Sequence, residues 1–316
     1  MPTRRLVEQQ DGILVFDTEY FRPGQAASHL VWHNGQAALV DVGPAAAAPV
    51  VLKALAAQQI DPSEIQIIFL THIHLDHAGA AGHLLQACPN ASVVVHPRGA
   101  KHLVDPARLV QGALAVFGET VFSEHIGSTV PVAEDRILIA EDGATFDLAG
   151  RSLKVFHTEG HARHHYCLAD VDFGGIFTGD SFGISYRELD TAAGPFIFPA
   201  TAPVQFDPPA AHDAIERIMS QAPQQIHLAH FGQLDCEQRL ADDLHRDLDV
   251  LVELARKHGC SKDSATALHT AVEGYLFQRV RDHGYAGSDA ELKSLLDLDI
   301  AINVQGLEVW LEREAG

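Results

Sequence analysis

The segment that most constrains this chain is His72-Ile73-His74-Leu75-Asp76-His77, in which four of six side chains are strong metal ligands. It follows the apolar run Ile67 to Leu70, which is typical of a buried strand. Burying three imidazoles and a carboxylate without partners would cost roughly several kcal/mol each, whereas a divalent metal ion makes such a cluster favourable. We therefore expect a fold that presents this segment to metal at the end of a buried strand.

The spacing within the segment suits two metal ions better than one. Residues two apart in an extended chain point to the same side, so His72 and His74 can reach one ion together. Asp76 and His77 are neighbours on a tightening loop, and their side chains diverge toward a second ion. Two ions about 3.5–4 Å apart can share a bridging ligand and a hydroxide.

Two metal ions need further ligands, and later strand ends offer them. Gly160-His161 follows a strand-like segment at 153–156, Gly179-Asp180 follows another at 175–178, and His230 follows a third at 226–229. Each candidate stands just past an apolar strand and next to or near glycine. This pattern predicts that all of them lie at one rim of a sheet structure.

Taken together, these motifs resemble those of the metallo-β-lactamase superfamily, and of its glyoxalase-II-like binuclear hydrolases in particular. The resemblance spans residues 39 to 232 in the expected order. The matching segments are Leu39-Val40-Asp41-Val42-Gly43, Thr71-His72-Ile73-His74-Leu75-Asp76-His77-Ala78-Gly79, Gly160-His161, Phe177-Thr178-Gly179-Asp180 and His230-Phe231-Gly232.

The resemblance implies a set of ligands for two divalent metal ions, with zinc as the first expectation and iron or manganese as alternatives. His72, His74 and His161 would hold the first ion, Asp76, His77 and His230 would hold the second, and Asp180 would bridge them. Among catalytic residues, Asp76 would also serve as general base. Tyr186 follows Asp180 by six residues, in the vicinity where some lactonases of the superfamily carry a tyrosine that donates to an oxyanion, although ordinary packing is the favoured explanation. Asp41 would orient a motif loop, or would cap the following segment without a functional role.

Composition and charge narrow the remaining classes. The chain has 316 residues, 47% hydrophobic and 20% charged, as in ordinary globular proteins, and no apolar run long enough to span a membrane. Its net charge of −20 disfavours nucleic acid as a partner. The first residues lack the pattern of a secretory signal, and the four cysteines show no paired spacing. These observations favour a cytoplasmic protein with reduced thiols and a small-molecule substrate, without a membrane partner.

The pattern of elements predicts an α/β fold, an αββα sandwich of two mixed sheets flanked by helices. We expect residues 1–234 to form this domain and residues 235–316 to form a helical appendage, which could also mediate a homodimer. Expected strands lie at 12–18, 29–33, 36–42, 64–70, 91–96, 136–140, 144–148, 153–158, 166–169, 174–178 and 225–229, and expected helices at 45–58, 80–87 and 208–221. Leucines at helical spacing, and a capping box of Ser288 and Glu291, indicate helices after residue 235.

The predicted function is that of a binuclear hydrolase in which metal-bound hydroxide attacks an ester, thioester or lactone carbonyl of a small molecule. Glutathione thioesters fit less well, because residues 235–316 contain 9 Lys and Arg against 17 Asp and Glu. The alternatives are a diiron protein that binds oxygen or nitric oxide or carries out redox chemistry, a phosphodiesterase, and a metal-bearing interaction module. Because His74 is histidine where flavodiiron proteins usually carry glutamate, hydrolysis is favoured over the first of these.

Overall fold

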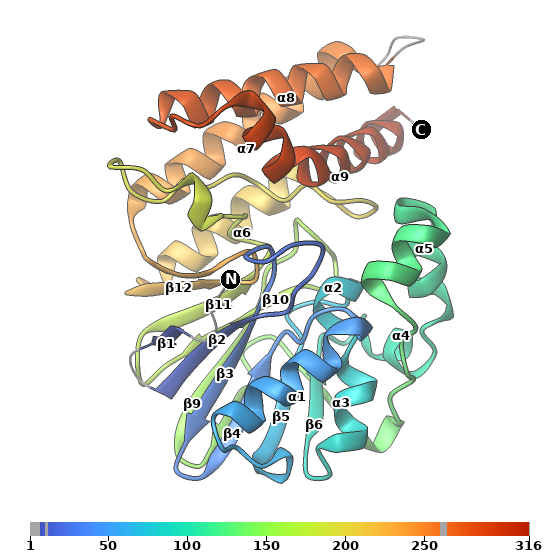
Figure 1. Ribbon diagram of the computed structural model, residues 1–316, viewed down its shortest axis with the longest axis vertical. Helices are drawn as coiled ribbons and strands as arrows, with labels where there is room; N and C mark the ends of the chain where they lie inside the picture. Colours follow the sequence, from blue (N-terminus) through green and yellow to red (C-terminus); the bar gives the residue numbers. More distant parts are fainter. Residues whose placement is uncertain (1–6, 10–11, 260–263, 316) are drawn as a thin grey trace. The chain divides into compact units, whose positions relative to one another are not determined.

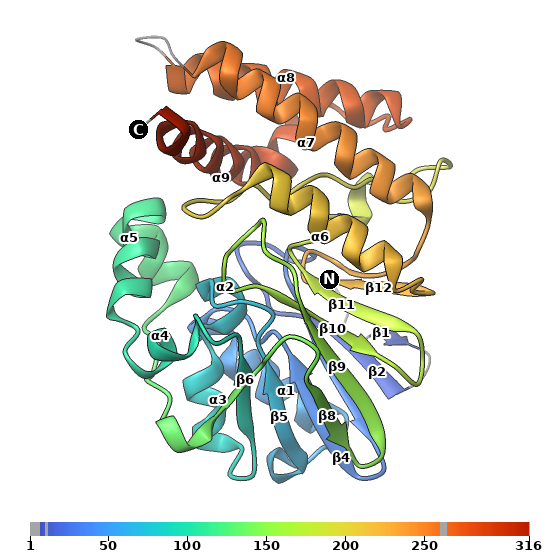
Figure 2. The ribbon, with the colours of Figure 1, turned by 180° about the vertical axis from the view of Figure 1, so that it is seen from behind.

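The computed structural model describes residues 7–9, 12–259 and 264–315, and these divide into two compact units (Figures 1 and 2). The first comprises Met1–His157, His164–Gly179 and Pro223–Asp235. The second comprises Thr158–Arg163, Asp180–Ala222 and Cys236–Gly316. The segments at 158–163 and 180–222 thus group with the helical C-terminal part. Whether residues 1–234 and 235–316 fold as separate domains stays a prediction.

The first unit contains a mixed sheet of seven strands in the order β1-β2-β3-β4-β5-β6-β7. Neighbours from β1 to β4 are antiparallel, and those from β4 to β7 are parallel. The strands are β1 (Val7–Gln9), β2 (Ile13–Asp17), β3 (Ala27–His33), β4 (Gln36–Val40), β5 (Ile65–Phe69), β6 (Ser92–Val95) and β7 (Ile137–Ile139).

A two-residue turn at Asn34-Gly35 joins β3 to β4. Both residues have positive φ, 46° and 79°, which matches the right-handed twist of the flanking strands and is tolerated best by asparagine and glycine. The turn sets the pairing in which Trp32 faces Ala37 and His29 faces Val40. This register places Leu39 on one side of the sheet and Val40 on the other.

The second sheet, also in the first unit, has six strands in the order β13-β12-β11-β10-β9-β8. Only the β11–β12 pair is parallel. The strands are β8 (Thr145–Leu148), β9 (Arg151–His157), β10 (Tyr166–Asp170), β11 (Gly175–Gly179), β12 (Gln225–Leu228) and β13 (Gly232–Asp235). The predicted sandwich of two mixed sheets is therefore confirmed, and β1 and β13 are strands that the sequence pattern did not indicate.

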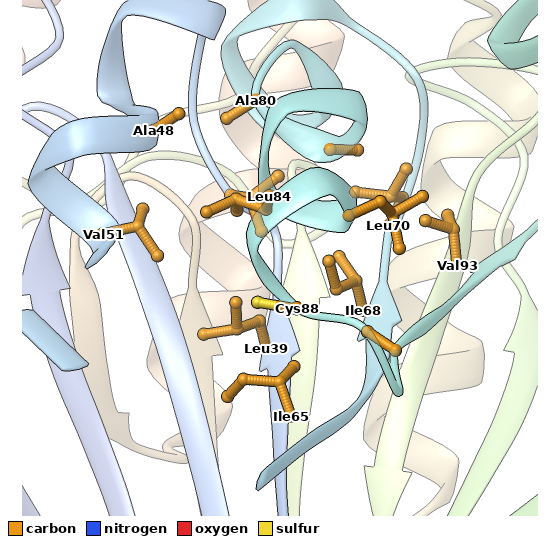
Figure 3. Packing of buried hydrophobic residues seen from close by; sticks show 14 of the residues in the cluster. Leu39, Ala48, Val51, Ile65, Ile68, Leu70, Ala80, Leu84, Cys88 and Val93 are labelled. Carbon is orange, nitrogen blue, oxygen red and sulfur yellow. The ribbon is translucent and has the colours of Figure 1, made fainter. Parts of the chain in front are cut away.

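Two apolar layers hold the first unit together. Alternate residues of both sheets, such as Val40, Phe69, Val155 and Leu168, form a core between the sheets. The opposite face of the first sheet packs against helices α1 and α3, where Leu39 and other buried side chains meet the helices (Figure 3). Figure 1 shows these two helices lying over β4, β5 and β6. Because both faces of β4 and β5 are covered, these strands are almost continuously apolar.

The helices of the first unit follow the strands of the parallel part of the sheet. Residues 99–130, for which the sequence pattern indicated no strand, contain two helices and a π-helical turn. The elements are η2 (Ala45–Ala47), α1 (Ala48–Ala57), η3 (Pro62–Glu64), α2 (Leu75–Ala78), α3 (Ala81–Ala87), α4 (Ala100–Val104), α5 (Ala107–Val121), η4 (Phe122–Ile126) and η5 (Glu134–Arg136).

The second unit is helical, as predicted for residues after 235. Ser288 and Glu291 form the predicted capping box, since the Glu291 carboxylate accepts from Ser288 N (2.6 Å) and Ser288 Oγ accepts from Glu291 N (3.3 Å). The predicted leucines Leu240, Leu244 and Leu248 are buried along one face of their helix. The elements are η6 (Arg187–Leu189), α6 (Pro208–Ser220), α7 (Gln238–His258), α8 (Ser264–Asp282) and α9 (Asp289–Ala315).

Two further observations concern membrane-spanning helices and cysteine pairing. Among the described residues, no helix is long and apolar enough to cross a membrane. Cys88, Cys167 and Cys236 form no disulfide with one another, and Cys260 lies outside the described residues.

Candidate metal centre

The metal-ligand segment begins where the buried strand β5 ends. Ile68, Phe69 and Leu70 are fully buried, and Thr71 continues the chain to the carboxyl end of the strand. His74 is extended, with φ −61° and ψ 147°, and is the residue before the short helix α2. His77 N donates to His74 O at 3.0 Å, which closes the first turn. His74 is therefore extended and the chain is helical after it, whereas Thr71 and His72 lie in a bend between β5 and this residue.

The side chains of His72 and His74 point toward each other just before α2. His72 Nε2 and His74 Nδ1 are 3.0 Å apart. Thr71 Oγ1 lies 3.2 Å from His72 Nδ1 and donates its own proton to Asp41 Oδ2 at 2.8 Å, so it acts as the acceptor for His72 Nδ1–H. This leaves the lone pair of His72 Nε2 directed at His74, which is the arrangement of two ligands of one cation.

Asp76, His77 and His230 form a second group of converging ligand atoms. Asp76 Oδ2 lies 3.4 Å from His77 Nε2 and 3.6 Å from His230 Nε2. One ligand atom from each of the three lies within 4.8 Å of the others. Nitrogen and carboxylate oxygen at these separations are suited to a divalent ion such as zinc. The first unit thus brings together five of the predicted metal ligands.

Asp41 orients this group from the end of β4. Its carboxylate accepts from Thr71 N at 2.9 Å, and its Oδ2 lies 3.1 Å from His77 Nδ1. Because a carboxylate is only an acceptor, it places the His77 proton on Nδ1 and leaves the lone pair of Nε2 for a metal. Asp41 itself adopts φ +50°, an uncommon backbone conformation for a residue other than glycine. The prediction that Asp41 orients a motif loop agrees with these contacts.

A backbone carbonyl plays the same part for His230. His230 Nδ1 donates to Gln25 O at 2.8 Å, which directs Nε2 toward Asp76. The neighbouring bond from Ala27 N to Ala229 O, at 2.7 Å, ties the two segments further. No sequence pattern marked Gln25 as part of the site, since it acts through its main chain, and Thr71 belonged to the matching motif without an assigned role.

The electrostatics of Asp76 favour its ionised form. Burial alone would raise the pKa of this carboxyl group, but the charges and hydrogen bonds of His77 and His230 hold its pKa well below the ordinary value. Asp76 therefore carries a negative charge at neutral pH, as a metal-ligating carboxylate must.

The second unit contains the remaining two predicted ligands. His161 Nε2 lies 3.3 Å from Asp180 Oδ2, and His161 Nδ1 donates to Ala200 O at 3.0 Å. A side chain on Gly160 would come within 2.5 Å of the Ala211 backbone, so glycine is required before His161. Asp180 is bonded directly to Gly179, the last residue of β11. A cavity of about 20 Å³, large enough for a water molecule, borders both His161 and Asp180.

Tyr186, the other predicted catalytic residue, is fully buried in the second unit. Its hydroxyl lies 2.9 Å and 3.0 Å from the two carboxylate oxygens of Asp299 on α9 and donates to that group. A role in oxyanion stabilisation would require the hydroxyl to leave this acceptor, and it stays a prediction.

Other histidines surround the first-unit ligands. The His165 ring stacks on His72 with centroids 5.0 Å apart, and the His164 ring lies 5.7 Å from that of His74. The His157 ring packs against that of His96, with the ring centroids 4.2 Å apart. Burial, together with the neighbouring charges, lowers the pKa of His96 to about 4, so His96 is neutral at pH 7.

Comparison with known proteins agrees with this fold. The model of the metallo-β-lactamase superfamily matches residues 21–304, and the chain belongs to that superfamily. The first unit has the two mixed sheets of this family, and its His/Asp groups are suited to binding metal ions.

Two curated relatives illustrate the range of similar sequences. The metallo-beta-lactamase fold-containing protein ST1585 of Sulfurisphaera tokodaii is 30% identical over 172 residues, which is 54% of this chain and 61% of that protein. Hydroxyacylglutathione hydrolase of Salmonella paratyphi A is 30% identical over 152 residues, 47% of this chain and 44% of that protein. The chain thus spans less than two thirds of the length of each.

Solved structures share the fold. The crystal structure of the archaeal protein ST1585 gives a TM-score of 0.64 at 23% identity and covers 97% of this chain and 99% of its own. A metallo-beta-lactamase family protein from Thermus thermophilus gives 0.68 at 18% identity, over 96% and 94%. A chemotaxis sensor with a peroxy diiron species gives 0.53 at 14% identity, over 76% and 93%. At these identities the likeness concerns the fold alone.

Proposed function

We propose that this protein is a binuclear metal-dependent hydrolase that cleaves an ester, thioester or lactone of a small molecule. The observation that carries the proposal is the convergence of Asp76, His77 and His230 within 4.8 Å, next to the His72–His74 pair. Five ligand side chains are more than the four that a closed structural zinc site uses. A second ion explains the additional side chains, since a catalytic site also keeps a coordination position open to water.

The proposed ligand set extends these five residues by His161 and Asp180. Its basis is the order of the sequence motifs and the superfamily to which the chain belongs. Asp180 directly follows Gly179, the last residue of β11. Residues 158–163 connect β9 to residue 164, where the chain belongs to the first unit again. Zinc is proposed for both ions, with iron and manganese as alternatives.

Divalent ions at such a site supply Lewis acidity and lower the pKa of water toward neutrality. The protein's own part is to hold and orient. Asp41 and Gln25 O place the protons of His77 and His230 on Nδ1, away from the metal side. The ionised Asp76 carboxylate holds its charge beside the two Nε2 atoms and accepts the proton of the attacking nucleophile.

The substrate we propose is a small carbonyl compound. A hydroxyacylglutathione hydrolase among the relatives points to thioesters. The acidic composition of residues 235–316 argues for an acyl group on a thiol or alcohol less anionic than glutathione. A diiron redox role is supported by one solved structure with this fold, the chemotaxis sensor with a peroxy diiron species. Hydrolysis is supported by His74, because flavodiiron proteins usually carry glutamate at that position.

Elemental analysis combined with an activity panel tests this proposal. Purified protein should contain two equivalents of metal and hydrolyse at least one class among thioesters, esters and lactones, with phosphodiesters as the comparison class. His77→Ala should lose one equivalent of metal and nearly all turnover. His269→Ala, a substitution on α8, which carries none of the proposed ligands, is the matched control and should keep both.

Two results would refute the proposal. One is a metal-replete protein that turns over none of these classes. The other is a His77→Ala variant that retains full metal content and full turnover. Two equivalents of iron with an oxygen-dependent absorption band, and no hydrolysis, would instead establish the diiron alternative.

A further inference from the structure

Helices α6 and α7 of the second unit carry a cluster of four side chains, here called the α6–α7 cluster: His212, Glu216, His245 and Asp249. The two helices pack against each other, as Figure 2 shows. Each contributes a histidine and, four residues later, a carboxylate. Residues four apart lie on the same face of a helix, so the cluster is built from two such pairs that face each other.

The two imidazole rings meet end to end. His212 Nδ1 and His245 Nδ1 are 2.6 Å apart. The ring planes differ by only 1°, and the centroids are 4.9 Å apart. This centroid separation is close to the nitrogen–nitrogen distance plus the two ring radii. The rings are therefore nearly coplanar, and the two Nδ1 atoms point straight at each other.

The other nitrogen of each ring lies beside a carboxylate of the opposite helix. His212 Nε2 is 3.3 Å from Asp249 Oδ1, and His245 Nε2 is 3.0 Å from Glu216 Oε1. Carboxylates are acceptors at neutral pH and favour protonated Nε2 in both rings. Both Nδ1 lone pairs would then face each other at 2.6 Å, which is repulsive unless a cation lies between them. A cation held between the two Nδ1 atoms would relieve this repulsion.

We propose that the α6–α7 cluster is a binding site for a divalent transition metal ion, separate from the residues proposed for hydrolysis. The ion would take the place between the two Nδ1 atoms that the hydrogen bond now occupies, and two nitrogen–metal bonds would form as that hydrogen-bonding proton leaves. Metal-bound histidines usually donate their other ring N–H to a carboxylate, and here a carboxylate oxygen lies within 3.3 Å of each Nε2.

Size and charge are compatible with this exchange. Two ligand nitrogens at about 2.0 Å from a tetrahedral zinc-like ion lie about 3.3 Å apart, so the rings must separate by less than about 1 Å from their present contact. The two side chains are 29% and 22% exposed, which leaves them room to rotate.

The charges around the cluster are mostly negative. Asp213 and Asp242 lie on the same helices and are exposed. The nearby cation Arg246 is engaged by Asp243 at 2.7 Å and by Asp247 at 3.0 Å, so it offsets little of the carboxylate charge. A divalent cation is therefore attracted to this face of α6 and α7.

Nickel is a suitable probe, because imidazole binds it well and because it can be counted separately from zinc. Zinc-loaded full-length protein is dialysed against Ni²⁺ at about pH 7.5, and both metals are then measured. Wild-type protein should bind one nickel more than His212→Ala or His245→Ala, without loss of zinc. Glu216→Gln and Asp249→Asn should weaken nickel binding by about 10- to 100-fold. His269→Ala, a half-exposed histidine on α8, should bind nickel like wild type.

Proton release and spectroscopy complete the test. Calorimetric titration in two buffers of different ionisation enthalpy should show about one proton released per nickel. Cu²⁺ should broaden the ring signals of the two cluster histidines before others. Equal nickel binding by wild type and both histidine variants would overturn the proposal and leave a pair that shares a proton only. So would nickel uptake matched by zinc loss. Since Glu216→Gln alters only an exposed carboxylate, it keeps the test valid if a histidine variant fails to fold.

Discussion

The role assigned to Asp41 can be tested by replacing its carboxylate with an amide of the same shape. In the native protein the two oxygens of Asp41 accept from Thr71 N, Thr71 Oγ1 and His77 Nδ1. In Asp41→Asn, one oxygen becomes an NH₂ donor. Whichever way the amide is turned, this donor faces at least one native donor. If it faces His77, the ring moves its proton to Nε2 and loses its metal-binding lone pair.

The size of the effect follows from the kind of contact. Loss of a group that orients a metal-ligating histidine typically costs about 10- to 100-fold in metal affinity, or roughly 1.4 to 2.8 kcal/mol of binding free energy. Asp41→Asn should therefore release one equivalent of metal at a chelator concentration about 10- to 100-fold lower than wild type requires. Metal retained after dialysis against graded chelator measures this.

Two comparisons make the Asp41 result decisive. The control is Asp172→Asn, which changes an exposed carboxylate whose Oδ2 accepts from Ser152 N at 2.7 Å. This variant should behave like wild type. Unfolding in the presence of excess chelator shows how much the variant destabilises the metal-free fold. If Asp41→Asn retains both metal equivalents with wild-type affinity, then Asp41 does not orient His77 as the contacts imply.

Further predictions concern pH, Tyr186 and assembly. Burial and the charge of Arg151 lower the pKa of His227 to about 3, far below the 6.5 of an exposed histidine, so its contribution to stability is full above about pH 6.5 and is lost as the pH falls toward 3. Between about pH 7 and pH 5, protonation of His227 should lower the free energy of unfolding by about 2 kcal/mol. In urea titrations, His227→Phe should reduce this pH dependence, whereas His269→Gln should leave it unchanged. Tyr186→Phe should lower stability by about 1 to 3 kcal/mol, because it leaves the buried Asp299 without this donor. A loss of turnover beyond tenfold in well-folded Tyr186→Phe protein would instead support an oxyanion role. The homodimer proposed through residues 235–316 should show twice the monomer mass in light scattering, and a monomer at all accessible concentrations would exclude it.

The sequence predicted those parts of the molecule that depend on local patterns. The strand at 65–69 that delivers His72 is a short apolar run, and the Ser288–Glu291 capping box depends only on residues three apart. Each of these is confirmed because neighbouring residues alone decide it. The five predicted ligands of the first unit could be named for the same reason, since the motifs that contain them follow apolar strands.

What escaped prediction depends on contacts between distant parts of the chain. Gln25 O serves His230 across 205 positions, and nothing in a glutamine next to alanines marks its carbonyl for that use. Strand β13 is short and contains glycine and aspartate, so only its pairing with β12 makes it a strand. Tyr186 was considered for catalysis from its distance to Asp180 in sequence, whereas its acceptor Asp299 is 113 positions away.

The bond between His230 and Gln25 has a consequence for how the protein is made. During synthesis, β2, β3 and the His72–His77 segment leave the ribosome long before β12 and residue 230. Until then, Gln25 O lacks the imidazole that it orients, and Asp76 lacks one of its two histidine neighbours. For the metal site proposed above, a nascent chain would therefore offer only an incomplete set of ligands, and tight loading would wait for the late arrival of β12.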